Sequence, residues 1–228
     1  MLDLLSKQTG TDAGIGLVSY SGSSSDLFLQ LHYCSIFLAR KKRVLIISSN
    51  LTESNYRLIF GKLAVRWDPS LISVVELGSL LGNDFKINGD NVVKELNELI
   101  DGESPPSLLI LEDVGVLERL GIKPSSIVCL LHRLYSRLVP CVNSVFGLSD
   151  EILANFVKTK TYNMMINKAD FTIDVTPVGL GFGKDVTGKM EISVRRAAPM
   201  PTTSQLLYLT GDRSIKCFYP GGNTFLNI

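Results

Sequence analysis

Up to residue 169, short apolar runs alternate along the chain with longer segments whose apolar residues recur at helical spacing. The runs have the length and the β-branched content of buried parallel strands. They span residues 15–20, 43–49, 71–77, 108–113 and 138–146. The segments between them predict amphipathic helices over residues 27–38, 52–65, 92–100 and 124–138, and a weaker helix over residues 150–165.

After Ala169 the pattern changes to strand-like segments in close succession, at residues 170–177, 190–196, 205–210 and 214–220. Two of the connections, "KDVTGK" and "TGDRS", place glycine where a hairpin turn needs a positive φ angle. We therefore predict a single domain, residues 1–228, with an α/β fold. Its sheet is expected to be mixed and mainly parallel, with helices on both faces and an antiparallel C-terminal part.

The composition fits such a domain, since 45% of the residues are hydrophobic and 8% are aromatic. The net charge of +1 gives no global attraction to nucleic acid or to membranes, so any such contact requires a local patch. The opening "MLDLLSKQTG" has no long apolar run, and no stretch approaches the length of a membrane span. We expect neither a signal peptide nor a membrane contact.

The cysteines and histidines do not predict a metal site. Cys34 and Cys129 fall on the expected inner faces of two helices, and Cys141 falls in an expected buried strand. No two cysteines have CxxC spacing, which indicates reduced thiols in an intracellular compartment. His32 and His132 lie alone on separate helices, so we expect no zinc and no other cofactor.

The stretch "VSYSGSSSDLFLQ" places a small polar turn between the first predicted strand and the first predicted helix, as in phosphate-binding loops. A working loop reads GxxxxGK[ST], in which the lysine reaches the phosphates and the hydroxyl binds magnesium. Here Gly22 is the one glycine, no lysine follows, and Asp26 occupies the first helical turn. Because a carboxylate repels a triphosphate, we expect Asp26 or Ser25 to cap the helix instead.

The run "LLILED" ends in Glu112 and Asp113, the form of a Walker B strand whose acids hold magnesium and position water. Without the lysine this match is weak. The glycines of "GLGFGK" lead into a hairpin rather than a helix, so they do not form a dinucleotide fingerprint. We therefore expect a nucleotide-binding type of fold that has lost its phosphate chemistry, and no ATP hydrolysis by this chain alone.

Three segments of the second half resemble the family of the sixth subunit of the Elongator complex. They are "LLILEDVGVLERLG", "GLGFGKDVTGKMEISVRR" and "YLTGDRSIKCFYPGG". The first contains an "LxxLG" segment that ends at Gly121, and the second contains a "KDVxG" hairpin followed by two arginines. The third is a closing strand that contains Cys217.

This resemblance implies a RecA-like domain without a Walker A motif, acting as a non-catalytic subunit. Its partners would be the fourth and fifth Elongator subunits, with which the family forms a hetero-hexameric ring, and the Elongator catalytic subcomplex. That ring binds tRNA, can hydrolyse ATP as an assembly, and supports modification of the wobble uridine at C5. The expected location is the cytoplasm, and also the nucleus.

The resemblance also suggests where tRNA would bind, because in RecA-like rings the loops after the acidic strand and after the next strand face the central channel. By order along the chain these loops are Gly115–Pro124 and Asn143–Lys160. The cations that they offer to tRNA phosphates are Arg119, Lys123, Lys158 and Lys160. For each of them the alternative is an ordinary solvated surface charge.

Three further residues are candidates for contacts with neighbouring subunits: Asp185, Arg195 and Arg196. For Asp185 the alternative is a turn-forming role. For the two arginines it is an ion pair within the domain or a contact with a helix C-terminus. Two other functions also stay open, namely an ATPase that is active or completed by a partner, and a RecA-like paralogue in another assembly.

Overall fold

The computed structural model describes residues 3–10, 14–21, 24–80, 89–101, 106–138, 143–149, 160–178, 186–195, 201–211 and 214–221. Its helices are α1 (Asp3–Thr9), α2 (Leu27–Ala39), α3 (Glu53–Lys62), the 3-10 helix η1 (Leu77–Leu80), α4 (Gly89–Asp101), α5 (Gly115–Arg119), α6 (Pro124–Leu138) and α8 (Lys160–Lys168). Its strands are β1 (Ile15–Tyr20), β2 (Val44–Ser48), β3 (Ile72–Glu76), β4 (Leu108–Leu111), β5 (Asn143–Ser149), β6 (Phe171–Pro177), β7 (Gly188–Val194), β8 (Thr202–Thr210) and β9 (Ile215–Phe218).

The described strands form one sheet in the order β3-β2-β4-β5-β1-β6-β7-β8-β9. The pairs from β3 to β6 are parallel, and the pairs from β6 to β9 are antiparallel. β5 lies between β1 and β4. Its Val145 is opposite Gly16 of β1 on one side and Ile110 of β4 on the other. The predicted fold class, a mainly parallel sheet with an antiparallel C-terminal part, is confirmed.

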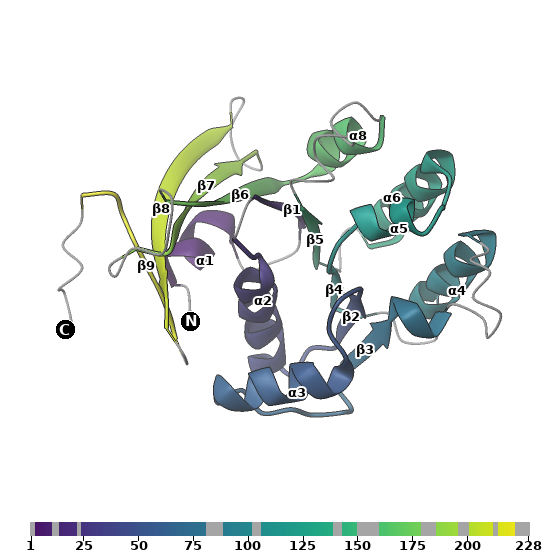
Figure 1. Cartoon of the computed structure of the whole chain (residues 1–228), viewed down its shortest axis with the longest axis horizontal. Helices are drawn as coiled ribbons and strands as arrows, with labels where there is room; N and C mark the ends of the chain where they lie inside the picture. The colour runs from purple at the N-terminus through teal and green to yellow at the C-terminus, as the bar shows by residue number, and fades with distance from the viewer. Residues whose placement is uncertain are drawn as a thin grey trace.

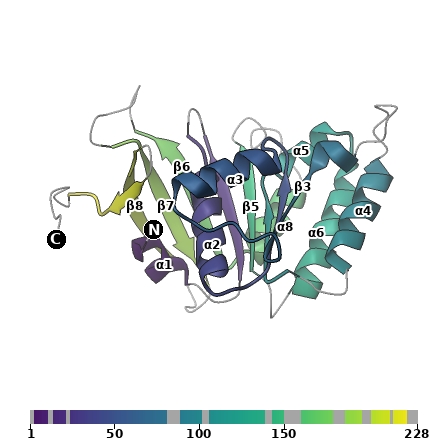
Figure 2. The ribbon, with the colours of Figure 1, turned by 90° about the horizontal axis from the view of Figure 1, so that it is seen from below.

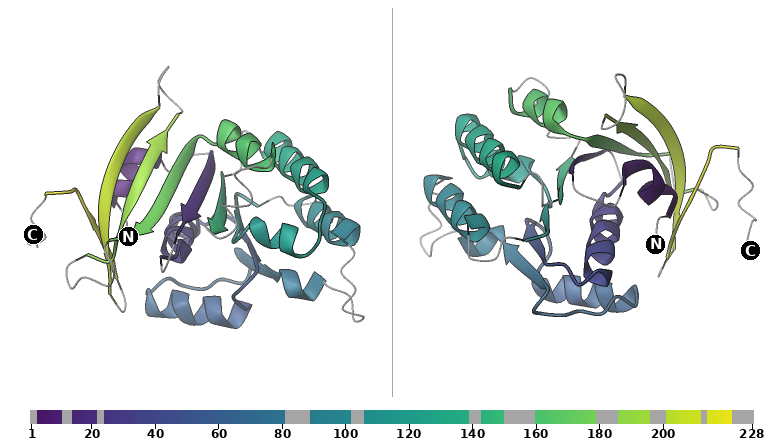
Figure 3. Two further views of the ribbon diagram at one scale, coloured as in Figure 1. Left: turned by 45° about the horizontal axis from the view of Figure 1, so that its top comes forward. Right: turned by 180° about the vertical axis from the view of Figure 1, so that it is seen from behind.

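Helices cover both faces of the parallel strands, as Figure 1 shows. α1, α2 and α3 pack on one face, and α4, α5, α6 and α8 pack on the other. α4 and α6 lie side by side (Figure 2), and Arg133 of α6 pairs with Asp101 of α4 at 2.6 Å. The sheet curves around α2, as both views of Figure 3 show. None of the described helices is long and apolar enough to cross a bilayer.

α2 is buried on nearly every side because the curved sheet, α1 and α3 surround it. Its buried residues include the polar Gln30 and His32 as well as apolar ones. Buried polar groups need internal hydrogen bonds, and the Nε2 atom of His32 lies 3.0 Å from Ser6 Oγ of α1. Burial lowers the pKa of His32 to about 4.

One helix, α1, was missed, and three sequence predictions of local structure require correction. α1 was not predicted, since seven residues are too few to show a period. The predicted loop after β4 contains the short helix α5. The fifth predicted strand, residues 138–146, is described as Asn143–Ser149; its expected first residue, Leu138, belongs to α6, and residues 139–142 lie outside the described residues. Cys129 is exposed, because the neighbouring Ile127, Leu130 and Leu131 form the buried face of α6.

The last predicted helix, residues 150–165, lies partly outside the described residues. α8 begins at Lys160 and ends at Lys168, three residues beyond the predicted end. Cys141 also lies outside the described residues. The predicted inner position of Cys34 is confirmed, since it is 1% exposed.

Candidate functional site

The turn after β1 and the acidic end of β4 lie at the same edge of the sheet, because β1, β4 and β2 all run parallel. We call this edge, at which Tyr20, Ser48 and Leu111 are the last strand residues, the carboxyl edge. Ligands of open α/β sheets bind outside the carboxyl ends of the strands. This edge is therefore the first place to look for a functional site.

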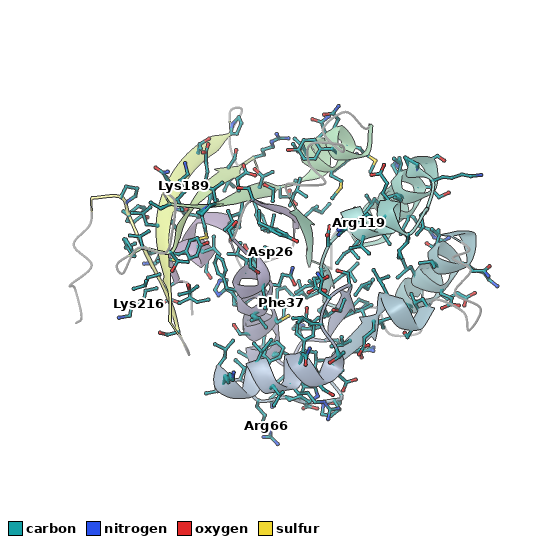
Figure 4. All side chains as sticks on the ribbon, in the orientation of Figure 1. Asp26, Phe37, Arg66, Arg119, Lys189 and Lys216 are labelled. Carbon is teal, nitrogen blue, oxygen red and sulfur yellow. The ribbon has the colours of Figure 1, made fainter. Side chains whose placement is uncertain are left out.

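Asp26 lies directly before α2, but its side chain does not cap the helix. Instead, Ser25 Oγ accepts a hydrogen bond from the Leu27 N–H at 3.2 Å, and Asp26 Oδ2 accepts one from Gln30 Nε2 at 2.8 Å. Of the two predicted caps, the structure thus supports Ser25. Asp26 is turned inward and is 5% exposed; Figure 4 marks its place at the start of α2.

The surroundings of Asp26 are apolar and negative. Burial is the main cause that raises the pKa of its carboxyl from 3.8 to about 7, and the charges of Glu112 and Asp113 raise it further. Gln30 links the segment that follows β1 to the segment that follows β4, since its Nε2 atom also lies 3.4 Å from the carbonyl oxygen of Glu112. Its Oε1 atom has no hydrogen-bond partner among the described residues.

Glu112 holds the connection between β2 and α3. Its Oε2 atom accepts hydrogen bonds from Ser48 Oγ at 2.7 Å, from the Ser49 N–H at 2.6 Å and from the Asn50 N–H at 2.9 Å. Glu112 is 7% exposed. One of the two carboxylate oxygens of Glu112, Oε2, is therefore engaged by groups of the chain itself.

Asp113 is also engaged, in this case with α5. Its Oδ1 atom accepts from the Gly115 N–H at 2.8 Å, and its Oδ2 atom accepts from Arg119 at 2.9 Å. Burial raises the pKa of Asp113, while the Gly115 N–H and the Arg119 charge lower it. The carboxylates of both acids that follow the Walker B-like strand thus make hydrogen bonds within the chain.

A cavity of about 300 Å³ lies beside the turn, between the start of α2 and the antiparallel strands. Its apolar wall includes Phe28, whose ring centroid lies 4.8 Å from that of Tyr208. The serines and threonines Ser24, Ser25, Thr187 and Thr210 also line it. No charged side chain lines it among the described residues, so the cavity offers nothing that would neutralise a triphosphate.

The structure places some of the predicted tRNA-contact residues. Arg119 ends α5 and is 56% exposed despite its pair with Asp113. Lys123 is exposed in the connection to α6. Lys160 is the first residue of α8, and its side chain is not described. Lys158 lies outside the described residues.

Of the predicted interface residues, Arg195 is described, and Asp185 and Arg196 lie outside the described residues. Arg195 follows β7, and its guanidinium donates to the carbonyl oxygen of Ile166 at 2.6 Å. Ile166 belongs to the last turn of α8. This is the alternative that the sequence left open, a contact with a helix C-terminus.

Sequence reasoning missed the partners of the three acids, namely Gln30, Ser48, Ser49, Asn50 and the Arg119 side chain as an ion-pair partner. Gln30 had one available signal, since it follows Asp26 by four residues and therefore shares its helix face. The Ser48–Asn50 contacts join positions more than sixty residues apart, so no local pattern reveals them.

No protein-family model matches this sequence, and no curated protein matches it. Solved structures do match the fold. The flagellar accessory protein FlaH from Methanocaldococcus jannaschii has a TM-score of 0.69 at 13% identity, with 96% of each chain covered. The KaiC-like protein PH0186 from Pyrococcus horikoshii has a TM-score of 0.62 at 12% identity, with 91% of this chain and 90% of that chain covered. This chain therefore has a RecA-like fold, which at such identities says nothing of function.

Proposed function

We propose that this protein is a non-catalytic, RecA-like subunit of the Elongator accessory ring, together with the fourth and fifth Elongator subunits. Its role there is to help bind tRNA while the Elongator catalytic subcomplex modifies the wobble uridine, in the cytoplasm or the nucleus. The resemblance of the three C-terminal segments motivates the choice of this family. The internal engagement of Glu112 and Asp113 supports the absence of catalysis.

The engagement of the two acids is the observation on which this proposal depends. In a phosphoryl-transfer site these carboxylates hold magnesium and position water. Here Glu112 accepts hydrogen bonds from two backbone N–H groups, which would lose this acceptor if the carboxylate turned toward a metal. Asp26 adds a third buried carboxyl group to Glu112 and Asp113 at this edge, in a turn where a phosphate loop would have a lysine.

The proposed assembly is tested by affinity purification of the tagged full-length chain from its native cell, followed by mass spectrometry. Recovery of the fourth and fifth Elongator subunits in equal amounts with the chain is the expected result. Recovery as a lone stable monomer, or with a different set of RecA-like proteins, would contradict the proposal. The second outcome would point to a paralogue in another assembly.

The rival function, an ATPase, is favoured by the strand–turn–helix layout and by the two acids after β4. It predicts magnesium-dependent ATP turnover that Asp113→Ala abolishes. We expect no turnover and no rise in melting temperature with ATP and magnesium, since a ligand that binds the native state raises it. Turnover by the assembled ring but not by the chain would support a partner-completed ATPase.

The tRNA role predicts an effect of charge reversal at the two lysines that follow β5 in the chain, Lys158 and Lys160. Lys158→Glu together with Lys160→Glu should weaken tRNA binding by the assembled ring and lower the dependence of affinity on salt by about 1 per lost phosphate contact. The matched control reverses Lys189 and Lys216, two cations of the antiparallel strands (Figure 4). Equal binding by both variants would show that Lys158 and Lys160 do not contact tRNA.

A further inference from the structure

One edge of β8 is only partly covered by β9. On its other side β8 pairs with β7 over residues 202–208, whereas its pairing with β9 covers residues 207–210. Residues 202–206 therefore have no neighbouring strand at this edge among the described residues. We call residues 202–206 the open edge.

The backbone groups of the open edge point away from the rest of the sheet. In an antiparallel pair, successive residues of a strand direct their N–H and C=O groups alternately to one side and to the other. Directly after β8, the Gly211 N–H donates to the carbonyl oxygen of Ser214 at 2.8 Å, so the odd-numbered residues of β8 face β9. Thr203 and Gln205 thus direct their N–H and C=O groups to the uncovered side.

The pairing of β7 gives the same direction. The N–H of Arg195, which follows β7, donates at 2.8 Å to the carbonyl oxygen of Asp170, which precedes β6. The odd-numbered residues of β7 therefore face β6, and its even-numbered residues face β8. Since Ile192 of β7 lies opposite Ser204, the even-numbered residues of β8 are the ones that face β7.

The chain's own last strand does not extend over the open edge. Phe218 ends β9 and lies opposite Leu207, so Pro220 would lie opposite Gln205 if β9 continued. Proline has no N–H group to donate to the carbonyl oxygen of Gln205. Gly221 follows with a positive φ of 78°, and the chain leaves the sheet after β9, as Figure 1 shows.

The open edge lacks a common protection against the addition of a strand. Edge strands often carry charged side chains, which keep other strands from pairing with them. β9 carries the exposed Lys216, and β3, at the other end of the sheet, ends in Glu76. The open edge reads "TTSQL" and has no charged residue, and its Thr202, Thr203 and Gln205 are exposed. It is therefore suited to accept a further strand.

Two groups beside the open edge would enlarge the contact with an added strand. On one face of the sheet, Ser204 Oγ donates to Gln8 Oε1 at 2.8 Å, which holds α1 next to this segment. At the end of β9, Tyr219 is 50% exposed and is one of the large exposed hydrophobic residues. Tyrosine is among the residues that anchor protein interfaces. The surface around the open edge thus offers side-chain contacts as well as backbone groups.

We propose that the open edge is a self-association surface, at which β8 pairs in antiparallel direction with β8 of a second copy of this chain. A two-fold axis at Ser204 places Thr203 of each copy opposite Gln205 of the other, so the outward N–H and C=O groups of both residues find partners. No charged side chains of residues 202–206 meet in this arrangement, because the segment has none. The segment therefore matches itself in direction, register and charge.

Sedimentation of the purified full-length chain over a range of concentrations tests the proposal. The wild type should form a dimer. Thr203→Lys with Gln205→Lys places introduced lysines opposite each other and should weaken the dimer about tenfold or more. The matched control, Ser54→Lys with Ser125→Lys, adds the same charge at exposed positions of α3 and α6 and should leave the dimer intact. A wild type that stays monomeric at its highest soluble concentration, or equal effects of both variants, would overturn the proposal.

A charge swap separates the pairing of strands from a general effect of the substitutions. Thr203→Glu with Gln205→Glu should also be monomeric by itself, because like charges again lie opposite each other. Mixed in equal amounts with the lysine variant, it should form a dimer with one chain of each kind, since each introduced lysine then faces an introduced glutamate. If the mixture stays monomeric while circular dichroism shows both variants folded, the proposal is wrong.

Two proline variants test the direction of the backbone, at a concentration at which both are monomeric. Gln205→Pro removes an N–H group that points outward, so it should weaken the dimer but lower the melting temperature of the monomer little. Ser204→Pro removes an N–H group that faces β7 and should lower the melting temperature much more. Equal decreases would show that Gln205 also faces β7, and self-pairing at this edge would then be rejected.

The inference goes beyond the proposed function and does not depend on it, because it concerns copies of this chain alone. A dimer of the isolated chain without recovery of Elongator subunits from cells would retain the self-association and reject the ring. A chain that is monomeric by itself but recovers those subunits would do the reverse. If Gln205→Pro then abolished this recovery, the open edge would be assigned to an extended segment of another subunit, and self-association would be overturned.

Discussion

At the scale of single residues, the raised pKa of Asp26 makes the stability of the folded chain depend on pH. The folded chain holds its carboxyl with a pKa of about 7, whereas the ordinary value is 3.8. From about pH 4 to pH 7 the folded state therefore keeps a proton that the unfolded state has released, so the free energy of unfolding falls as pH rises. A pKa change of this size corresponds to about 4 kcal/mol.

Asp26→Asn removes the contribution of this ionisation to the free energy of unfolding. We expect the variant to be more stable than the wild type at about pH 8 by roughly 2 kcal/mol, since the amide cannot ionise but must bury an extra N–H group. The amide oxygen can still accept the hydrogen bond from Gln30. Urea denaturation at a series of pH values measures the effect.

In the Asp26→Asn variant, His32 should dominate the dependence of the free energy of unfolding on pH. Its folded pKa of about 4 lies below its ordinary value of 6.5, so its contribution to stability is lost as pH falls from about 6.5 to 4. In the wild type this slope opposes that of Asp26, and Asp26→Asn should expose it. Asp68→Asn, a change at an acid whose pKa is lowered by its bonds to Ser70, is the control. Parallel profiles of wild type and Asp26→Asn would contradict the account.

At the scale of secondary-structure elements, the pairing of β1 with β6 requires a glycine. Gly16 lies directly opposite Phe171, and a Cβ atom on Gly16 would lie 2.2 Å from Phe171 Cζ. Gly61, by contrast, is inside α3, and nothing lies within 4 Å of its Cβ position. Alanine at these two positions should therefore change the stability of the protein in opposite directions.

Gly16→Ala should destabilise the protein by about 1 to 3 kcal/mol through overpacking, whereas Gly61→Ala should stabilise it by about 0.5 to 1 kcal/mol through helix propensity. Chemical denaturation of both variants measures the difference. If the ring of Phe171 is the obstacle, Phe171→Leu in the Gly16→Ala background should recover part of the loss. A loss of stability that Phe171→Leu leaves unchanged would point to the backbone instead.

The elements also show how far the sequence predicts the structure. The strands β1, β2 and β4 were predicted well, because mostly buried strands are continuous apolar runs bounded by polar residues. The edge strand β3 was also predicted from its apolar run, although only Ile72 of this strand is buried. α1 is too short to show a period, and Cys129 lies one position away from the buried face of its helix. The presence of acids at the carboxyl edge was predictable, but the partners of those acids follow from the order of strands, which local pattern does not determine.

At the scale of the whole molecule, the parallel and antiparallel parts share one core. The ring of Phe28 of α2 contacts that of Tyr208 of β8, and the ring of Tyr33 of α2 lies 5.8 Å from that of Phe171 of β6, measured between ring centroids. The same cluster extends to Phe60 of α3. Neither part can lose its packing without exposing this cluster.

This shared core predicts one cooperative unfolding transition. Trp67, the single tryptophan, lies next to Phe60 on the side of α3, so its fluorescence reports the parallel part. The midpoint of its fluorescence change in urea should coincide with the midpoint from far-UV circular dichroism, which reports all strands and helices. Separate midpoints would contradict the prediction of a single domain over residues 1–228.

The contacts of Glu112 restrict how this fold could change its chemistry. A lysine at residue 26 would meet Glu112 and Asp113 before it met any phosphate, and it would be neutralised as an internal ion pair. Freeing Glu112 for a metal would at the same time release the turn at Ser49 and Asn50. In the proposed non-catalytic role, a site for a triphosphate would therefore need changes at residue 26 and around Glu112 together.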